Sequence, residues 1–229
     1  NIFTKAKIIL ESKLDRTFKK HNIDLAYFLS PTDLTLALNC YNYIFTVWDL
    51  CFFDFPEFPE VYINREFQRR ERLYRLAIAK AIAIVTDSEF TKSSIIRKYC
   101  VAKERVIPLS FLPSNAISTL KEAHSRNLID IDKKYNIGGK YIFYPAQFWP
   151  HKNHIYILEG LKLLKEKYKI EIHGLFTGSD KGNLRFILNK AQEFGIDNLI
   201  HYIGFIEDTE IPYLYAQALA LVMPTYFGP

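Results

Sequence analysis

Short apolar runs alternate with longer amphipathic segments along almost the whole of this 229-residue chain. The alternation is typical of a parallel β-sheet, because each crossover helix must carry the chain back to the same end of the sheet before the next strand begins. We therefore predict an α/β fold with two series of parallel strands. The first series lies near residues 24–29, 43–48, 83–86 and 105–109, and the second near 140–145, 170–178, 199–204 and 220–224.

The segments between these runs have the spacing of helices. In residues 152–168, for example, Ile157, Leu158 and Leu161 fall on one face, and Glu159 and Lys162 fall on the opposite face. We predict helices over residues 4–20, 59–81, 88–99, 120–136, 152–168, 182–194 and 208–218.

A polar, proline-containing stretch interrupts the alternation at residues 108–118 and predicts a domain boundary. We expect an N-terminal Rossmann-like domain over residues 1–112 and a C-terminal one over residues 113–229. The last strand runs into PTYFGP where a further helix is expected, and the chain opens in a helix where a strand is expected. Both domains are therefore expected to be incomplete, as in a fragment of a longer polypeptide.

The net charge is only +5, and basic residues are interleaved with acidic ones, as in REFQRRER from Arg65 to Arg72. This balance does not indicate nucleic acid, and we expect none as a partner. A solvated helix face is the first interpretation of REFQRRER, and contact with anionic lipid or another polyanion is the second.

The three cysteines, Cys40, Cys51 and Cys100, are too scattered to indicate a disulfide framework, and none belongs to a pattern typical of a metal site. No apolar run approaches the roughly 18 residues needed to cross a bilayer, because Asp49 and Asp54 interrupt the most apolar stretch. We therefore expect no metal and a cytoplasmic location, with peripheral contact at the inner face of a membrane as an option.

Ligands of open α/β sheets bind beyond the carboxyl ends of the strands, where helix N-termini present free N–H groups and a positive dipole. Lys152 follows the fifth predicted strand at the entrance of a helix, so it either holds a diphosphate or points to water. Gly178 and Ser179 follow the sixth strand, although TGSDKGN lacks a complete phosphate-loop motif and is also ordinary turn chemistry. The stretch GFIED follows the seventh and offers free backbone to a flat ligand.

Asp49 directly follows the second predicted strand. A carboxylate at this point is a candidate for a polar contact with a substrate, and the alternative is that it fixes its own loop. The chain has no nucleophile elbow, catalytic-triad spacing or HExxH motif.

Seven segments, in their order and spacing, are more specific together than any one alone: TVWDL, VTDSEFTKSSIIRKY, RVIPLSFLPS, YIFYPAQFWPHKNH, GLFTGSD, IHYIGFI and LVMPTYFGP. In these segments the chain resembles the GT-B retaining glycosyltransferases of family four (glycosyltransferase group 1), particularly bacterial members that build surface polysaccharides such as lipopolysaccharide. The resemblance implies two Rossmann-like domains facing a cleft. It also implies transfer of a sugar, with retention and without a metal or cofactor, from a UDP- or GDP-linked donor to a glycan or lipid-linked acceptor.

The resemblance further implies the residues of the site. Lys152 stands where the family has a Lys that clamps the donor diphosphate, and Gln147 stands where the family has an Arg, so one charge of the clamp is lost. Asp49 carries over as the catalytic-side residue, while Trp48 replaces the family's acceptor-side His. The other implied donor-binding residues are Gly178, Ser179, Gly204, Phe205, Ile206, Thr225 and Gly228.

In this resemblance Thr225 takes the first position of the family's paired glutamates, and the second position lies beyond Pro229. Two hypotheses follow. The first is a nucleotide-sugar glycosyltransferase of the hexosyltransferase type, and it leaves open whether this fragment is active alone. The second is a non-catalytic GT-B scaffold that serves as a partner subunit or as a polyanion-binding module.

Overall fold

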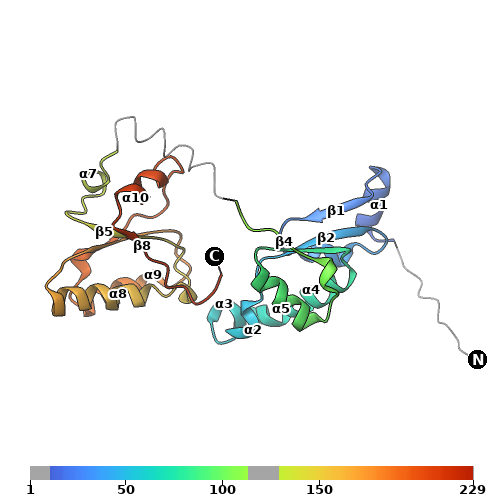
Figure 1. Ribbon diagram of the computed structural model, residues 1–229, viewed down its shortest axis with the longest axis horizontal. Helices are drawn as coiled ribbons and strands as arrows, with labels where there is room; N and C mark the ends of the chain where they lie inside the picture. The colour runs from blue at the N-terminus through green and yellow to red at the C-terminus, as the bar shows by residue number, and fades with distance from the viewer. Residues whose placement is uncertain (1–10, 113–128, 229) are drawn as a thin grey trace, which may run out of the picture. The chain divides into compact units, whose positions relative to one another are not determined.

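The computed structural model describes residues 11–112 and 129–228 (Figure 1). The chain divides into two compact units, of which the first ends at Phe111 and the second runs from Leu112 to Phe227. The acceptor-side and donor-side roles of the two domains stay predictions. The part of the predicted helix over residues 4–20 that precedes residue 11, and most of the one over residues 120–136, lie outside the described residues.

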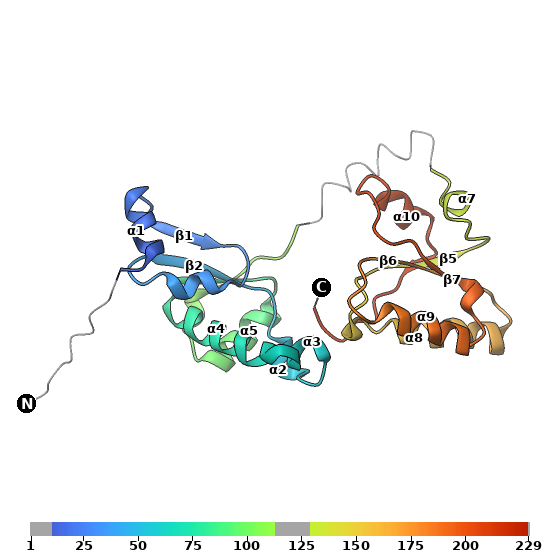
Figure 2. The ribbon, with the colours of Figure 1, turned by 180° about the vertical axis from the view of Figure 1, so that it is seen from behind.

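The N-terminal unit contains a parallel sheet with the order β1-β2-β3-β4, so the first predicted series of strands is confirmed. Figures 1 and 2 show α2 to α5 together on one side of this sheet. The strands are β1 (Leu25–Phe28), β2 (Asn42–Val47), β3 (Ala83–Thr86) and β4 (Val106–Pro108). The helices are α1 (Lys13–Lys20), η1 (Asp33–Ala37), α2 (Cys51–Asp54), α3 (Pro59–Tyr62), η2 (Ile63–Arg65), α4 (Glu66–Lys80), α5 (Glu89–Tyr99) and η3 (Lys103–Arg105).

The two faces of this sheet differ in burial. Phe45, Ile84 and Val106 are paired across three strands, and all are at most 2% exposed. They belong to the helix-covered face, because α4 contacts β2, and α5 contacts β3 and β4. Successive side chains of a strand alternate between faces, so Tyr27 of β1 and Ile107 of β4 fall on the opposite face, where they are 47% and 42% exposed.

The prediction of a single helix over residues 59–81 is wrong, because the segment is divided into α3, η2 and α4. Asn64 and Arg65 both adopt left-handed backbone angles, with φ of 56° and 59°, which an α-helix cannot accommodate. The break separates the exposed residues Tyr62 and Ile63 from the stretch of α4 that buries Leu73. The short helix α2 was not predicted, because four residues are too few to show a helical period.

The C-terminal unit contains a second parallel sheet with the order β7-β6-β5-β8, which confirms the second predicted series. Figures 1 and 2 show α8 and α9 on one face of the sheet, and α7 and α10 on the other. The strands are β5 (Tyr141–Pro145), β6 (His173–Thr177), β7 (Ile200–Tyr202) and β8 (Ala220–Leu221). The helices are α7 (Ile131–Tyr135), η4 (Pro150–Lys152), α8 (His154–Leu163), η5 (Leu164–Tyr168), α9 (Leu184–Glu193), η6 (Asp197–Leu199) and α10 (Ile211–Gln217).

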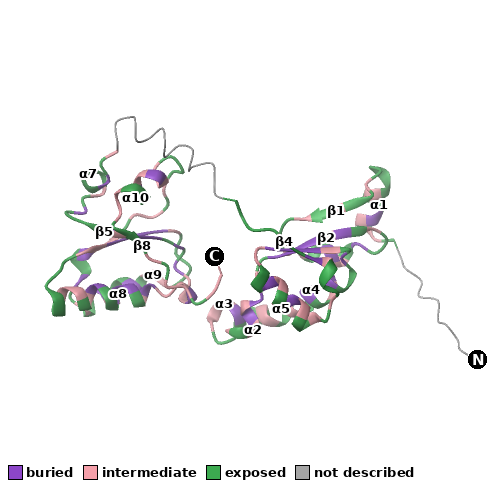
Figure 3. Ribbon diagram, in the orientation of Figure 1, coloured by how far each residue is buried: buried purple, intermediate pink, exposed green. Residues whose placement is uncertain are grey.

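Each face of this sheet has its own apolar core, as Figure 3 shows by the buried residues on the strands and on α8. On one face, Phe143 and Leu175 pack with Leu214 of α10. On the other face, Tyr144 and Phe176 pack with residues of α8 and α9. Neighbouring positions of one strand therefore contribute to opposite cores, so the central residues of β5 and β6 are apolar or aromatic on both faces.

No helix in the described ranges is long and apolar enough to span a bilayer. The same ranges contain no cluster of three or more His, Cys, Asp or Glu side chains suited to a metal ion.

A buried carboxylate anchors α1 to the loop before β2. Ser12 caps the helix: its hydroxyl accepts from the backbone N–H of Asp15 at 3.0 Å, and the Asp15 carboxylate accepts from the N–H of Ser12 at 2.8 Å. The same carboxylate accepts from the backbone N–H groups of Asn39 at 3.0 Å and Cys40 at 3.1 Å. Burial alone would raise the pKa of Asp15, but these backbone donors outweigh it and hold the pKa below its usual range.

We expect Asp15→Ala to lower the free energy of unfolding by about 1–3 kcal/mol, because three backbone donors lose their acceptor. Urea unfolding followed by circular dichroism measures this loss. The matched control is Asp24→Ala, which removes an exposed carboxylate nearby in the chain and should change stability by less than about 0.5 kcal/mol. Equal effects of the two changes would contradict the anchoring role.

The difference between Asp15→Ala and the parent should also depend on pH. A carboxyl group whose pKa is lower in the folded chain stabilises it fully above the unfolded pKa of about 3.9. That stabilisation is lost as the pH falls through the lower folded value. The stability difference should therefore be constant near neutral pH and shrink only below about pH 4.

Candidate functional site

The strand order of the C-terminal sheet creates a topological switch point between β5 and β8. The chain runs outward from β5 through β6 to β7, and then crosses back to place β8 on the other side of β5. The loops after β5 and β8 therefore leave neighbouring strands at the same edge of the sheet. The carboxyl ends of parallel strands at a switch point are where open α/β sheets bind ligands.

The loop after β5 contains Gln147 and Lys152. Gln147 is exposed, and its side-chain oxygen accepts from the indole N–H of Trp149 at 3.0 Å. Lys152 ends the short helix η4, and its backbone carbonyl accepts from the Tyr144 hydroxyl at 2.8 Å. Asn153 has a left-handed φ of 55°, so α8 begins at His154, two residues later than predicted. Lys152 thus lies on a turn just before a helix N-terminus, where unpaired N–H groups favour anions.

Gly178 lets the loop after β6 approach the loop after β5. Its φ is +123°, and a Cβ at this position would lie 2.6 Å from the carbonyl oxygen of Ala146 and 2.9 Å from the backbone nitrogen of Gln147. The neighbouring Ser179 accepts from the Phe148 N–H through its backbone carbonyl at 3.1 Å, and its side chain is exposed. The loops that carry Gln147, Gly178 and Ser179 are therefore joined directly.

The loop after β7 joins the same group through Gly204. Its carbonyl accepts from the Gly178 N–H at 2.9 Å and from the Thr177 hydroxyl. Phe205 is 89% exposed, so its ring is available to a flat ligand. Ile206 differs, because its side chain packs against the core of Phe143 and Leu175, which leaves its backbone as the part suited to line a site.

The loop after β8 is held against the loop after β5. The Tyr226 N–H donates to the carbonyl of His151 at 2.9 Å, and the Asn153 side-chain amide donates to the carbonyl of Pro224 at 3.2 Å. Phe227 stacks on the His151 ring with centroids 4.2 Å apart. Thr225 lies within this loop beside the switch point, and its hydroxyl donates to the carbonyl of Phe227 at 2.7 Å. Gly228 follows with a φ of +71°.

The structure therefore brings together the backbone at Gln147, Gly178, Ser179 and Gly204, and it brings the loop of Thr225 against that of Lys152. Asp49 is different, because it belongs to the N-terminal unit. It follows β2, and its carboxylate accepts from the backbone N–H of Cys51 at 3.0 Å, so it orders its own loop. One carboxylate can make this bond and still present a second oxygen.

His154 was missed as part of this region by sequence reasoning. It begins α8 but is fully buried, stacked on Phe148 with centroids 4.2 Å apart and edge-on to Phe176. Burial lowers the pKa of His154 to about 4, and the charge of Lys152 also lowers it. An interaction with the backbone of Ala146 acts in the opposite direction and raises the pKa. Its ring is therefore neutral at pH 7. A polar residue at the start of a helix is expected to be exposed, so no feature of the sequence predicted the burial of His154.

Known structures of low sequence identity share this fold. A glycosyltransferase from Rickettsia africae matches with a TM-score of 0.62 at 18% identity, over 98% of this chain and 58% of that one. The Anabaena protein HepE, solved with UDP and glucose, matches with a TM-score of 0.62 at 14% identity, over 90% and 53% of the two chains. The chain thus has the α/β architecture of GT-B glycosyltransferases, with two parallel sheets.

The sequence comparisons point to a family. Residues 127–229 match the model of the family glycosyl transferases group 1. The O-antigen chain mannosyltransferase B of Escherichia coli is 25% identical over 171 residues, which is 74% of this chain and 44% of that protein. The similarity to glycosyltransferase group 1 therefore lies in the part of the chain from residue 127 onward. The chain spans about half the length of the relatives it matches.

We expect Gly178→Ala to destabilise the C-terminal unit more than any other glycine change in its loops. An alanine here must adopt a left-handed φ and also push back the backbone of Ala146. The matched control is Gly182→Ala, which has a φ of +91° but no atom within 4 Å of the new Cβ. Urea unfolding should show a loss about 1–3 kcal/mol larger for Gly178→Ala. Equal losses would mean that the close approach of the two loops is unimportant.

We also expect His154 to make stability fall on acidification. An unfolded His binds its proton near pH 6.5, whereas buried His154 does so only near pH 4, so protons favour the unfolded chain between these values. His154→Phe, which keeps an aromatic ring, should flatten the fall in thermal midpoint between about pH 6.5 and 4. The exposed His21, changed to Phe, is the control and should leave the slope as it is. An unchanged slope in His154→Phe would contradict its neutral burial.

Proposed function

We propose that this chain is part of a glycosyltransferase that moves a hexose from a nucleotide-sugar donor to a glycan or lipid-linked acceptor. One observation carries the proposal: four loops meet at the carboxyl edge of one parallel sheet, and Lys152 lies among them at a helix N-terminus. The family match over residues 127–229 covers all four of these loops.

The donor we propose is a UDP- or GDP-linked sugar. Support for UDP comes from HepE, which was solved with UDP and glucose, and support for a hexose comes from the mannosyltransferase of Escherichia coli. In our proposal the exposed ring of Phe205 and the backbone from Gly204 to Ile206 lie along the base. The diphosphate lies at the start of α8, where N–H groups and Lys152 provide positive charge.

In the proposed reaction, an acceptor hydroxyl forms a bond to the anomeric carbon while the bond from that carbon to the diphosphate breaks, and the hydroxyl proton passes to the leaving diphosphate. The leaving diphosphate gains negative charge, which Lys152 and the helix amides stabilise. Gln147 donates a hydrogen bond to it without neutralising charge. We propose that the reaction retains the anomeric configuration and needs no metal, and that Asp49 contacts the acceptor. The family resemblance supports these three points.

The alternative, a polyanion-binding scaffold, is not favoured by the surface of α4. Arg69 pairs with Glu66 and Asp33, Arg70 pairs with Glu66, and Arg75 pairs with Glu71. These guanidinium groups are engaged within the chain, so a polyanion would have to displace carboxylates to bind them. Arg69, Arg70 and Arg75 therefore fit a solvated helix face whose charges are paired within the chain.

For the location, we propose the cytoplasm, with peripheral contact at the inner face of a membrane. The three cysteines are unpaired, which fits a reducing compartment. A lipid-linked acceptor would bring the enzyme to the membrane surface.

The proposal predicts that Lys152 contributes to nucleotide binding. Lys152→Ala should weaken UDP or GDP binding about tenfold or more in calorimetry, because a charge-assisted hydrogen bond to phosphate is lost. Gln147→Arg should strengthen it, since it adds the missing charge, and both effects should shrink at high salt. Lys167→Ala, at the exposed far end of the α8–η5 segment, is the control and should bind like the parent. Absence of nucleotide binding in the parent at millimolar concentration would overturn the proposal.

A further inference from the structure

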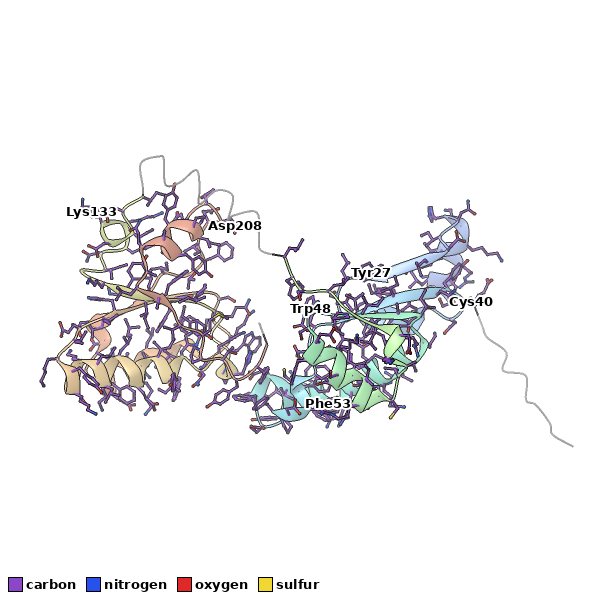
Figure 4. All side chains as sticks on the ribbon, viewed as in Figure 1. Tyr27, Cys40, Trp48, Phe53, Lys133 and Asp208 are labelled. Carbon is purple, nitrogen blue, oxygen red and sulfur yellow. The ribbon has the colours of Figure 1, made fainter. Side chains whose placement is uncertain are left out.

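Lysine and arginine are scarce in the four loops that meet at the carboxyl edge of the C-terminal sheet. Lys152 in the loop after β5 and Lys181 in the loop after β6 are the two lysines of these loops, which contain no arginine. The loop after β7 carries acidic residues instead, including Asp208, which Figure 4 shows beside α10. The diphosphate of a nucleotide sugar carries more than one negative charge, so Lys152 alone leaves part of that charge unbalanced.

Lys181 lies against the loop after β5. Its ammonium is 5.6 Å from the centroid of the Trp149 ring, and the indole N–H of Trp149 donates to the side-chain oxygen of Gln147 at 3.0 Å. One indole therefore contacts both Lys181 and Gln147. The backbone joins the same two loops, because the Phe148 N–H donates to the carbonyl of Ser179 at 3.1 Å. These contacts hold Lys181 beside Trp149, the residue that begins the turn leading into α8.

The charge of Lys181 is available to a ligand. The side chain is exposed, and no carboxylate within residues 11–112 and 129–228 forms an ion pair with it. The carboxylate of the adjacent Asp180 is engaged by its own loop, where it accepts from the backbone N–H groups of Gly182 at 2.7 Å and Leu184 at 3.2 Å. A cation over an exposed aromatic ring is held more weakly than one that bonds to phosphate, so an anion can draw Lys181 from the indole.

We propose that Lys181 is a second cation of the donor site and binds the diphosphate together with Lys152. The resembled family has an Arg where this chain has Gln147, whose amide brings no charge. Lys181 contacts the same indole as Gln147, so it brings a positive charge to that position from the neighbouring loop. A lysine suits this role, because its ammonium is a compact charge on a flexible stem. This inference rests on the proposed function and adds a residue to its donor site.

Calorimetry with UDP or GDP tests the contact. Lys181→Met keeps the apolar stem over the indole and removes the charge, so nucleotide binding should weaken about fivefold, and by less at high salt. Lys190→Met is the matched control. Lys190 also lies over an aromatic ring, 5.9 Å from the centroid of Phe186, but it is paired with Glu193. The control should bind nucleotide like the parent, and unchanged affinity in Lys181→Met would overturn the inference.

A double-variant cycle separates a shared phosphate contact from a structural role. If Lys181 supplies the charge that Gln147 lacks, Gln147→Arg should raise nucleotide affinity more in Lys181→Met than in the parent. Equal gains in the two backgrounds would refute the shared contact. The thermal midpoint of Lys181→Met should equal that of the parent, and a lower midpoint with unchanged affinity would assign Lys181 to loop stability instead.

The same titrations distinguish this inference from the proposed function on which it rests. If neither UDP nor GDP binds the parent at millimolar concentration, the proposed function falls, and this inference falls with it. If nucleotide binds the parent and Lys181→Met equally well, Lys181 alone is removed from the donor site.

Discussion

The parallel pairing of β5 with a strand on each side is the constraint on which the candidate site depends. It places the carboxyl ends of β5, β6 and β8 at one edge, so their loops must emerge together. Gly178 then lets two of these loops approach to a distance that no side chain would permit. The bond from Phe148 to Ser179 also joins these two loops, and the bond from Gly178 to Gly204 extends the contact to the loop after β7. The site is accordingly a property of backbone positions, with few side chains required to form it.

In our proposal, this backbone character lets a site with little charge hold a phosphate. Gln147 brings no charge, and buried His154 is neutral at pH 7 because burial lowers its pKa to about 4. Lys152 is therefore the cation contributed by the loop after β5 and the start of α8. Helix N–H groups provide fixed partial charges that need no counter-ion and cost little to orient. An anion bound here would depend on the position of α8, which the bonds between the β5 and β8 loops hold in place.

Most of the fold follows from the sequence, because apolar runs report strands that are buried on both faces, such as β5 and β6. Ligands of parallel sheets bind beyond the carboxyl ends of the strands, and this rule selected Lys152, Gly178 and Gly204 as candidates without knowledge of side-chain geometry. Local backbone choices were not predictable. Left-handed angles at Asn153 and at the Asn64–Arg65 pair ended or broke helices whose apolar period continues through them. The burial of His154 was also not predictable, because it depends on aromatic rings from three separate strands and loops.

The carboxyl edges of the two sheets differ in the groups that they expose. At the edge of the C-terminal sheet the loops bond to one another through backbone atoms, and Trp149 is tied to Gln147. At the edge of the N-terminal sheet Trp48 and Leu109 present exposed side-chain faces. A backbone cradle recognises a group that is the same in every donor, such as a diphosphate. An exposed side chain such as Trp48 can change without disturbing the sheet, whereas a side chain at Gly178 would push two loops of the C-terminal unit apart.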